Sequence, residues 1–457
     1  MPANSLAGFP LRFFQNFLTL HPDLDVISPT DPEWIHAQQQ YYINYAERPS
    51  TIARPRYATQ IQDLIRLCAS YNVEFVIRTG GHDCAGRSQV NGALAIDMRN
   101  IQYVHVSEDR QTARGIRGLL HPRESAMVVF VDGKLIRELS APLGSVGYVG
   151  WATLGGYSPL MAKYGLGVDQ IVGARYVNGD GELIEADQEA LVGIRGGGGS
   201  FGVITELTIK ILTGNLIFEQ TDKQATWFAY AENYQRLLDS GHMPRCLSLQ
   251  PAAVAIPNVG NVLSISATWA DANHDEGHRW FQEIANWGIC LMKSVKPTTW
   301  HMYCAENEKL ASSQVHGRAR TLNFRQLTPR TISILAEYNA SIPGPGSLIA
   351  AQHVRLTEPG LPSVFNPRGE YYWLEIVGTS RDPNVGRRAD EWARALKQKL
   401  LENDPGNILD SAYVGFLDNN ETDLARVYGS NCEALLAIKK KLDEKNIFKN
   451  TVPNLNI

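Results

Sequence analysis

Residues 76–88, Val-Ile-Arg-Thr-Gly-Gly-His-Asp-Cys-Ala-Gly-Arg-Ser, carry the strongest fold signal in this chain. The apolar run that ends at Ile77 predicts a short buried strand, and Gly80 and Gly81 predict a tight turn directly after it. Successive backbone N–H groups in such a turn form a concavity that binds an anion such as a pyrophosphate. His82 would then stand beside the ligand as a nucleophile, base or tether. An ordinary turn with a surface histidine is the alternative.

Three further segments extend this signal along the chain. Residues 147–169 and 194–206 are rich in glycine, and residues 428–448 close the chain. In this order and spacing, the four segments resemble the FAD-linked oxidases of the berberine-bridge-enzyme-like type, within the vanillyl-alcohol-oxidase superfamily. The resemblance is nearly full-length. It implies an α+β, two-domain, PCMH-type FAD-binding fold, with a substrate domain of antiparallel sheet covered by helices.

The resemblance also implies how the cofactor is held. In that family the histidine at the place of His82 is bonded to the 8α-methyl carbon of the isoalloxazine ring. The other residues expected to contact the cofactor are Arg78, Thr79, Gly80, Gly81, Asp83 and Ser88 at the turn, Gly147, Gly150, Gly155 and Gly156 in the next segment, and Gly202 and Val203 in the third.

Many relatives have a second, cysteinyl link to the flavin, from a Cys-Pro element ahead of the second glycine segment. Here that stretch is residues 140–147, and the place of the cysteine falls on Leu143 or on Ala141, depending on the alignment. Neither side chain can form the bond. We therefore expect FAD attached through His82 alone.

A base is needed to take a proton from an alcohol or phenol while hydride leaves for the flavin. Glu375 falls near the position where some relatives carry a glutamate base; a strand carboxylate or an ion-pair partner is the equal alternative. Other relatives use the second tyrosine of a Tyr-x-Asn-Tyr segment, but Phe416 stands there. Tyr413 survives and is expected to line the site, with packing as an equally good explanation.

Composition restricts the classes of partner. The formal net charge is −4 over 457 residues, whereas proteins that bind polyanions usually carry excess positive charge, so we expect no nucleic-acid partner. No apolar run approaches the ~20 residues of a membrane span, and the six scattered cysteines do not suggest a metal site. The N-terminus lacks the pattern of a signal peptide, which favours the cytoplasm without excluding secretion.

The chain exceeds the ~250–300 residues at which one core stops growing, so two domains are expected. We assign 1–213 to the FAD-binding domain, with its PCMH-type core at about 48–213, 214–415 to the substrate domain and 416–457 to a return to the first domain, as the resemblance implies. Periodicity predicts helices at 58–71, 275–287 and 386–402, strands at 73–77, 94–98, 203–212, 247–254, 262–269 and 371–377, and a hairpin at 171–184.

Three functions remain open at this point. The first is an FAD-dependent oxidase of a small, aromatic or polyketide-like secondary metabolite, with molecular oxygen as electron acceptor. The second is a carbohydrate oxidase acting at an anomeric carbon. The third is a flavin-bearing cyclase or scaffold without redox chemistry, which residues 112–140 motivate, because a strand and an Asp-Gly turn stand there in place of the amphipathic helix of relatives.

Overall fold

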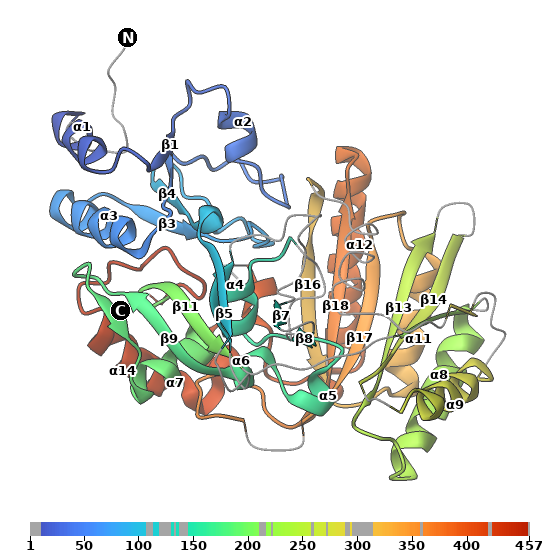
Figure 1. The fold of residues 1–457 in the computed structure, drawn as a ribbon. Helices are drawn as coiled ribbons and strands as arrows, with labels where there is room; N and C mark the ends of the chain where they lie inside the picture. Colours follow the sequence, from blue (N-terminus) through green and yellow to red (C-terminus); the bar gives the residue numbers. More distant parts are fainter. Residues whose placement is uncertain are drawn as a thin grey trace.

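The computed structural model describes residues 11–106, 113–117, 129–131, 134–136, 145–209, 216–220, 223–256, 260–270, 273–287, 293–294, 314–356, 360–418 and 423–455. Two units lie side by side, each around a large hydrophobic core (Figure 1). The C-terminal segment, red in Figure 1, lies among the green and blue elements of the N-terminal unit. No helix in these ranges is long and apolar enough to cross a bilayer.

The N-terminal unit contains a small sheet that carries the glycine turn. Its order is β1 (Asp25–Ile27), β2 (Thr51–Arg54), β4 (Leu94–Asp97) and β3 (Phe75–Arg78), with β2 and β3 parallel to β4. Helix α3 (Ala58–Tyr71) joins β2 to β3 and buries the apolar stripe of Ile61, Leu64, Ile65 and Cys68 in the first core. The carboxyl end of β3 therefore delivers residues 79–88 to the rim of the sheet.

A second, antiparallel sheet of the same unit has the order β10 (Leu183–Glu185), β9 (Ile171–Val177), β11 (Val203–Ile209), β6 (Ala113–Arg117) and β5 (Gln102–Val106). The same unit contains the short helices α1 (Leu11–Leu20), α2 (Trp34–Ala37), α4 (Tyr148–Thr153), α5 (Met161–Tyr164), α6 (Gly167–Gln170) and α7 (Gln188–Gly197). A separate hairpin joins β7 (Val129–Val131) to β8 (Lys134–Ile136).

The middle of the chain forms an antiparallel sheet with helices on one face (Figure 1). Its order is β15 (Lys293–Ser294), β12 (Leu216–Gln220), β14 (Gly260–Trp269), β13 (Leu247–Ile256), β17 (Leu348–Arg355), β18 (Glu370–Ser380) and β16 (His316–Phe324). The helices are α8 (Lys223–Asp239), α9 (His274–Ala285), α11 (Pro329–Ala340) and α12 (Pro383–Asn403).

Strand β18 separates the two cores, because successive side chains of a strand point to opposite faces. Tyr372, Leu374 and Ile376 lie in the core under the helices. Tyr371 and Trp373 lie in the core of the N-terminal unit. The same alternation turns residue 375 toward the N-terminal unit.

The C-terminal segment packs back on the N-terminal unit. Helix α13 (Leu424–Tyr428) leads to α14 (Cys432–Leu442), which lies on α7. Glycines make this close contact possible: a Cβ on Gly193 would come 2.9 Å from Ile438, and one on Gly197 would come 2.9 Å from Leu435. The Nδ2 of Asn450 donates to the carbonyl of Phe75 at 3.1 Å, which ties the tail to β3.

Lys439 anchors this return from a fully buried position. Its Nζ donates to Asp443 at 2.5 Å and to the carbonyl of Ser200 at 2.8 Å. We expect Lys439→Met to destabilise the protein by about 3–5 kcal/mol, because Asp443 would keep a buried charge without its counter-ion. Urea unfolding measures this. Lys441→Met, which breaks the exposed pair with Glu189, is the control and should change little.

The secondary-structure predictions from sequence are confirmed within a few residues. Helix 58–71 coincides with α3, 275–287 with α9 and 386–402 with α12, and the 171–184 hairpin is β9–β10. The predicted strand within 112–140 corresponds to β7, which pairs with β8, while the Asp-Gly turn and much of that stretch lie outside the described residues. The α+β architecture is as expected.

Candidate functional site

The turn after β3 and the start of α4 are in backbone contact. A Cβ on Gly80 would lie 2.3 Å from the amide nitrogen of Gly147 and 2.7 Å from the carbonyl oxygen of Ser145. A Cβ on Gly147 would lie 2.4 Å from Oγ1 of Thr79. Both positions therefore require glycine because of close approach. The structure brings these two predicted cofactor segments together, although they are 67 residues apart (147 − 80).

We expect Gly80→Ala to disrupt this contact, because the neighbouring atoms are backbone and cannot turn away. Overpacking of this kind costs about 1–3 kcal/mol, and it should also lower the amount of FAD that copurifies. Gly406→Ala is the control, since a Cβ there meets nothing within 4 Å. Urea unfolding and the ratio of flavin to protein measure the two effects. Equal behaviour of both variants would contradict the role of this contact.

Positive φ angles explain a second set of glycines. Gly81 has φ +73° at the turn, and Gly155 and Gly156 have φ +143° and +75° after α4. A Cβ on Gly156 would lie 2.4 Å from Cα of Gly167. Gly150 is different, because its nearest contact would be 3.8 Å away; there the glycine leaves open space.

The third segment lies beside the second sheet. Gly202 packs on Tyr176, whose ring would come within 2.4 Å of a Cβ, and Val203 begins β11 opposite Val177. Helix α7 ends in this segment and a strand follows. A nicotinamide-binding fold requires a helix to begin at its glycine motif, and this segment has the opposite order.

His82 lies at the centre of the first turn and is only partly exposed. Its ring packs against Tyr41, with ring centroids 4.2 Å apart and planes at 31°. Burial lowers the pKa of His82 to about 3. The imidazole is therefore neutral at physiological pH, and one of its nitrogens keeps a lone pair.

The neighbouring residues that we expected at the pyrophosphate differ in burial and in the partners they contact. Asp83 forms a partly buried ion pair with Arg87 at 2.7 Å, so its charge is already used to close the loop. Ser88 follows it and is partly exposed. Arg78 is buried below the turn, where its Nη2 donates to Asp97 at 2.6 Å and to the carbonyl of Ala37.

Buried donors below the turn fit a phosphate-bearing cofactor. Nε and Nη1 of Arg78 and Nε2 of Gln40 are buried and have no hydrogen-bond partner in the part of the chain that the structure describes. Both side chains flank Gly81, where a Cβ would lie 3.8 Å from Gln40 and 3.9 Å from Arg78. Unpaired buried donors are costly unless a ligand satisfies them. FAD fits this cradle with its negatively charged pyrophosphate.

Glu375 lies on the face of the substrate sheet that is turned toward the N-terminal unit, close enough to interact electrostatically with Tyr42 and Tyr413. It lies on β18 between Thr321 and Ala350. It has no hydrogen bond to the described residues, and burial raises its pKa to about 7. A carboxylate with a pKa near the working pH is suited to general-base catalysis, and the role of Glu375 as a base stays a prediction.

Aromatic side chains surround Glu375. Tyr157 stacks on Trp373 with centroids 4.4 Å apart, and Tyr413 meets Trp373 edge to face at 5.9 Å. Burial raises the pKa of Tyr413 well above its usual value, and the nearby Tyr157, Cys84 and Glu375 add to the shift. Tyr413 therefore stays protonated and is suited to donate a hydrogen bond, whereas the base role suits the carboxylate. Phe416 lies 5.1 Å from its ring.

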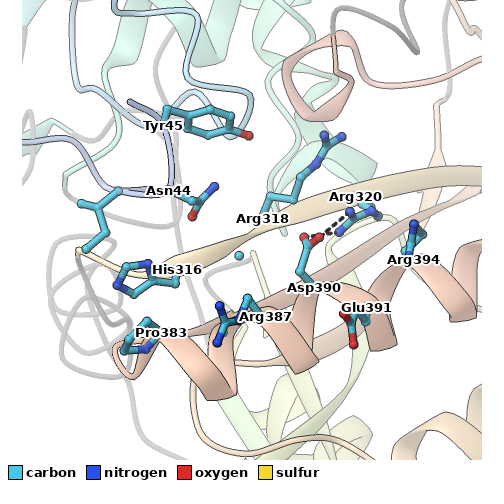
Figure 2. A pocket seen from close by; sticks show the side chains of 13 residues that line it. Asn44, Tyr45, His316, Arg318, Arg320, Pro383, Arg387, Asp390, Glu391 and Arg394 are labelled. Atoms are coloured by element: carbon cyan, nitrogen blue, oxygen red, sulfur yellow. Dashed lines mark hydrogen bonds and ion pairs between the residues drawn. The ribbon is translucent and has the colours of Figure 1, made fainter. Parts of the chain in front are cut away.

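A groove of about 720 Å³ lies on another face of the sheet, between residues 43–45, β16 and α12 (Figure 2). Arg320 points from its floor to Asp390 of α12, with two bonds of 2.7 and 3.0 Å. Thr321 points to the opposite face, where Trp373 donates to it. The groove is therefore separate from the face that carries Glu375.

Sequence analysis missed residues 41–45, which contact the His82 turn. No periodic pattern marks this segment as helix or strand, and its Tyr-Tyr-Ile-Asn-Tyr run is its only local signal. Tyr42 is buried with Cys84, Val315 and Ala319. Contacts of this kind depend on tertiary structure and carry no local signature.

Two units of this architecture, with paired glycine segments and a histidine at the cradle, define a PCMH-type FAD-binding oxidoreductase. Comparison with known families agrees: residues 49–187 match the FAD binding domain, and residues 412–453 match the berberine and berberine-like family. The chain is therefore similar to the berberine-bridge-enzyme-like FAD-linked oxidoreductases over an FAD binding domain and a C-terminal segment.

Individual proteins show the same likeness. The FAD-linked oxidoreductase aurO of Gibberella zeae is 28% identical over 443 residues, which are 94% of this chain and 85% of that protein. The crystal structure of 6-hydroxy-D-nicotine oxidase from Arthrobacter nicotinovorans superposes with a TM-score of 0.80 at 20% identity, over 95% of this chain and 98% of that one. Chitooligosaccharide oxidase gives 0.76 at 18%, over 96% and 98%. The last two show the shared fold.

No group of three or more histidine, cysteine, aspartate or glutamate side chains within the described ranges is placed to hold a metal ion.

Proposed function

We propose that the protein oxidises a small aromatic or polyketide-like metabolite, with FAD attached through His82 alone and molecular oxygen as the electron acceptor. One pair of observations supports this most strongly: the histidine of the glycine cradle is neutral, and Glu375, on the sheet face turned toward the N-terminal unit, has a pKa near 7. When bound, the flavin accepts a hydride. The fungal relative aurO is named an FAD-linked oxidoreductase, which is consistent with this role.

Glu375 takes the proton in this proposal. Its carboxylate removes the proton of the substrate hydroxyl, which increases the tendency of the adjacent carbon to give up a hydride. Trp373, Tyr157 and Tyr413 form an aromatic wall on which a flat substrate can stack. A stacked aromatic pair is stabilised by ~0.5–1.5 kcal/mol in addition to the free energy of burying its apolar surface. Tyr413 donates a hydrogen bond to the substrate oxygen.

Purified protein tests the tether. We expect a yellow protein whose flavin stays with the polypeptide after acid precipitation, and His82→Ala should release all of its flavin. Ala141 and Leu143, the two places for a second link, lie outside the described residues. A mass increase equal to one FAD on the denatured wild-type chain, absent from His82→Ala, would support a single link. Complete release of flavin from wild type would overturn it.

Carbohydrate oxidation is the second candidate, because chitooligosaccharide oxidase shares the fold. A screen of phenolic and allylic alcohols against oligosaccharides, measured by hydrogen peroxide formation, separates the two. If no compound reduces the flavin under anaerobic conditions, the third candidate, a non-redox cyclase or scaffold, gains support. A cytoplasmic location is also part of the proposal.

A further inference from the structure

Residues 41–45, which we call the strap, connect the His82 turn to the edge of the substrate sheet. The amide of Tyr41 donates to the carbonyl of Gly81 at 3.0 Å, while the carbonyl of Tyr41 accepts from the amide of Val315 at 3.0 Å. The amide of Ile43 donates to the carbonyl of Val315 at 3.0 Å. Backbone bonds therefore fix the strap on both sides.

Two side chains of the strap act directly on the turn. The Tyr41 ring packs on His82 at 4.2 Å between centroids. The Tyr45 hydroxyl donates to the carbonyl of Cys84 at 2.6 Å. The Tyr45 ring also fills the space beside Gly86, where a Cβ would lie 2.4 Å from it. The turn is thus held at, before and after the histidine.

The far end of the strap is held by the substrate unit. Tyr42 is buried against Cys84 on one side and Val315 and Ala319 on the other. Figure 2 shows Asn44 and Tyr45 above the floor of the groove, opposite His316 and Arg318 of β16. The strap is therefore held in place at both ends, and contact with it fixes the position of the His82 ring.

We infer that Tyr41 is a positioning residue for flavin attachment, and that its ring fixes the plane of the His82 imidazole so that one nitrogen faces the 8α-carbon of bound FAD. The inference depends on the proposed tether. A histidine ring rotates over a broad range about its second side-chain torsion, and an aromatic neighbour narrows that range. Reaction between held groups requires the atoms about 3–3.5 Å apart and aligned, so a lost support slows it strongly.

Attachment of the flavin forms one covalent bond and is a two-electron oxidation of the attached groups. A bond forms between the imidazole nitrogen and the 8α-carbon, while one N–H and one C–H bond break. The two hydrogens and two electrons are taken up by the isoalloxazine ring. Molecular oxygen then accepts them as hydrogen peroxide, which returns the attached flavin to its oxidised form.

Tyr41→Leu removes the ring and keeps an apolar side chain, whereas Tyr41→Phe keeps the ring. The experiment measures acid-stable flavin and total bound flavin in the purified full-length chain, over time after addition of FAD. We expect Tyr41→Leu to attach flavin roughly 10–100-fold more slowly, with total binding within about threefold of wild type. Tyr41→Phe should attach at a rate within about threefold of wild type.

Several outcomes would overturn the inference. Attachment at the wild-type rate in Tyr41→Leu would remove the role of the ring, and equal loss in Tyr41→Phe would transfer it to the hydroxyl. Parallel loss of attached and total flavin would indicate a structural role only. Wild type without acid-stable flavin would overturn the proposed tether, and this inference with it. If Tyr41→Leu does not fold, Tyr41→Met carries the same expectation. Tyr57→Leu, at an exposed tyrosine, is the control.

Discussion

Glu375→Gln should lower the rate of substrate-dependent flavin reduction at pH 8 by about 10²–10⁴-fold, the usual contribution of a general base. The amide keeps the size of the side chain but cannot accept the proton. Because the pKa of Glu375 lies at about 7, the wild-type rate should rise with pH through that value, and the variant should lose this rise. Stopped-flow reduction under anaerobic conditions measures both.

The same variant should be more stable than wild type in alkaline buffer. The pKa of Glu375 is raised in the folded protein, from 4.5 to about 7, so the folded state binds the proton more tightly than the unfolded chain. The cost of the buried charge is absent below pH 4.5, grows up to pH 7 and is complete above it. After allowance for partial exposure, we expect a gain of about 2 kcal/mol at pH 8.

Glu391→Gln is the matched control for both measurements, since Glu391 lies on the exposed surface of α12 beside the groove. It should alter neither the rate nor the stability. An unchanged rate and pH profile in Glu375→Gln would show that the base is another group.

Asp97→Asn should destabilise the protein by about 3–5 kcal/mol. Asp97 is fully buried at the end of β4 and accepts from Arg54, Arg78 and Arg99. Its removal leaves the guanidinium of Arg78 buried without a counter-ion. Since Arg78 directly precedes the glycine turn, the ratio of FAD to protein should fall as well.

The contribution of Asp97 to stability depends on pH in the opposite direction to that of Glu375. Burial alone would raise the pKa of Asp97, but the charges of Arg78 and Arg99 and their hydrogen bonds lower it. Its stabilisation is therefore complete above the unfolded value of about 4 and is lost only in more acidic solution. Thermal unfolding at pH 5–8 should show a constant difference between variant and wild type. Asp63→Asn, which breaks an exposed pair with Arg66, is the control.

The elements of the fold followed from periodicity wherever one face of a helix or strand is buried. Helix α3 has such a pattern, whereas strand β18, buried on both faces, is marked by its aromatic and β-branched residues; the observed bounds of both lie within three residues of the predicted ranges. The glycine segments predicted the cradle because glycine marks the tight turns and close backbone contacts that the cradle requires. Their mutual contact at Gly80 and Gly147 is a tertiary property, so its geometry had to come from the structure.

Electrostatic surroundings were less predictable. Arg78 stands next to the predicted turn, yet the sequence does not show that Asp97 occupies one edge of its guanidinium, because the partner comes from a parallel strand 19 residues later. The raised pKa of Glu375 likewise depends on burial by residues from both units. The strap could not be predicted from the sequence for the same reason, because its role depends on tertiary contacts with the His82 turn and with β16.

The tail tied to β3 has a consequence for biosynthesis. The N-terminal unit has these contacts only when Lys439 donates to Ser200 and Asn450 donates to Phe75, and a ribosome makes both residues after the whole substrate unit. During translation, the glycine segments therefore lack these contacts until the substrate unit has been synthesised. We expect the N-terminal unit to reach its final packing only after that unit has left the ribosome.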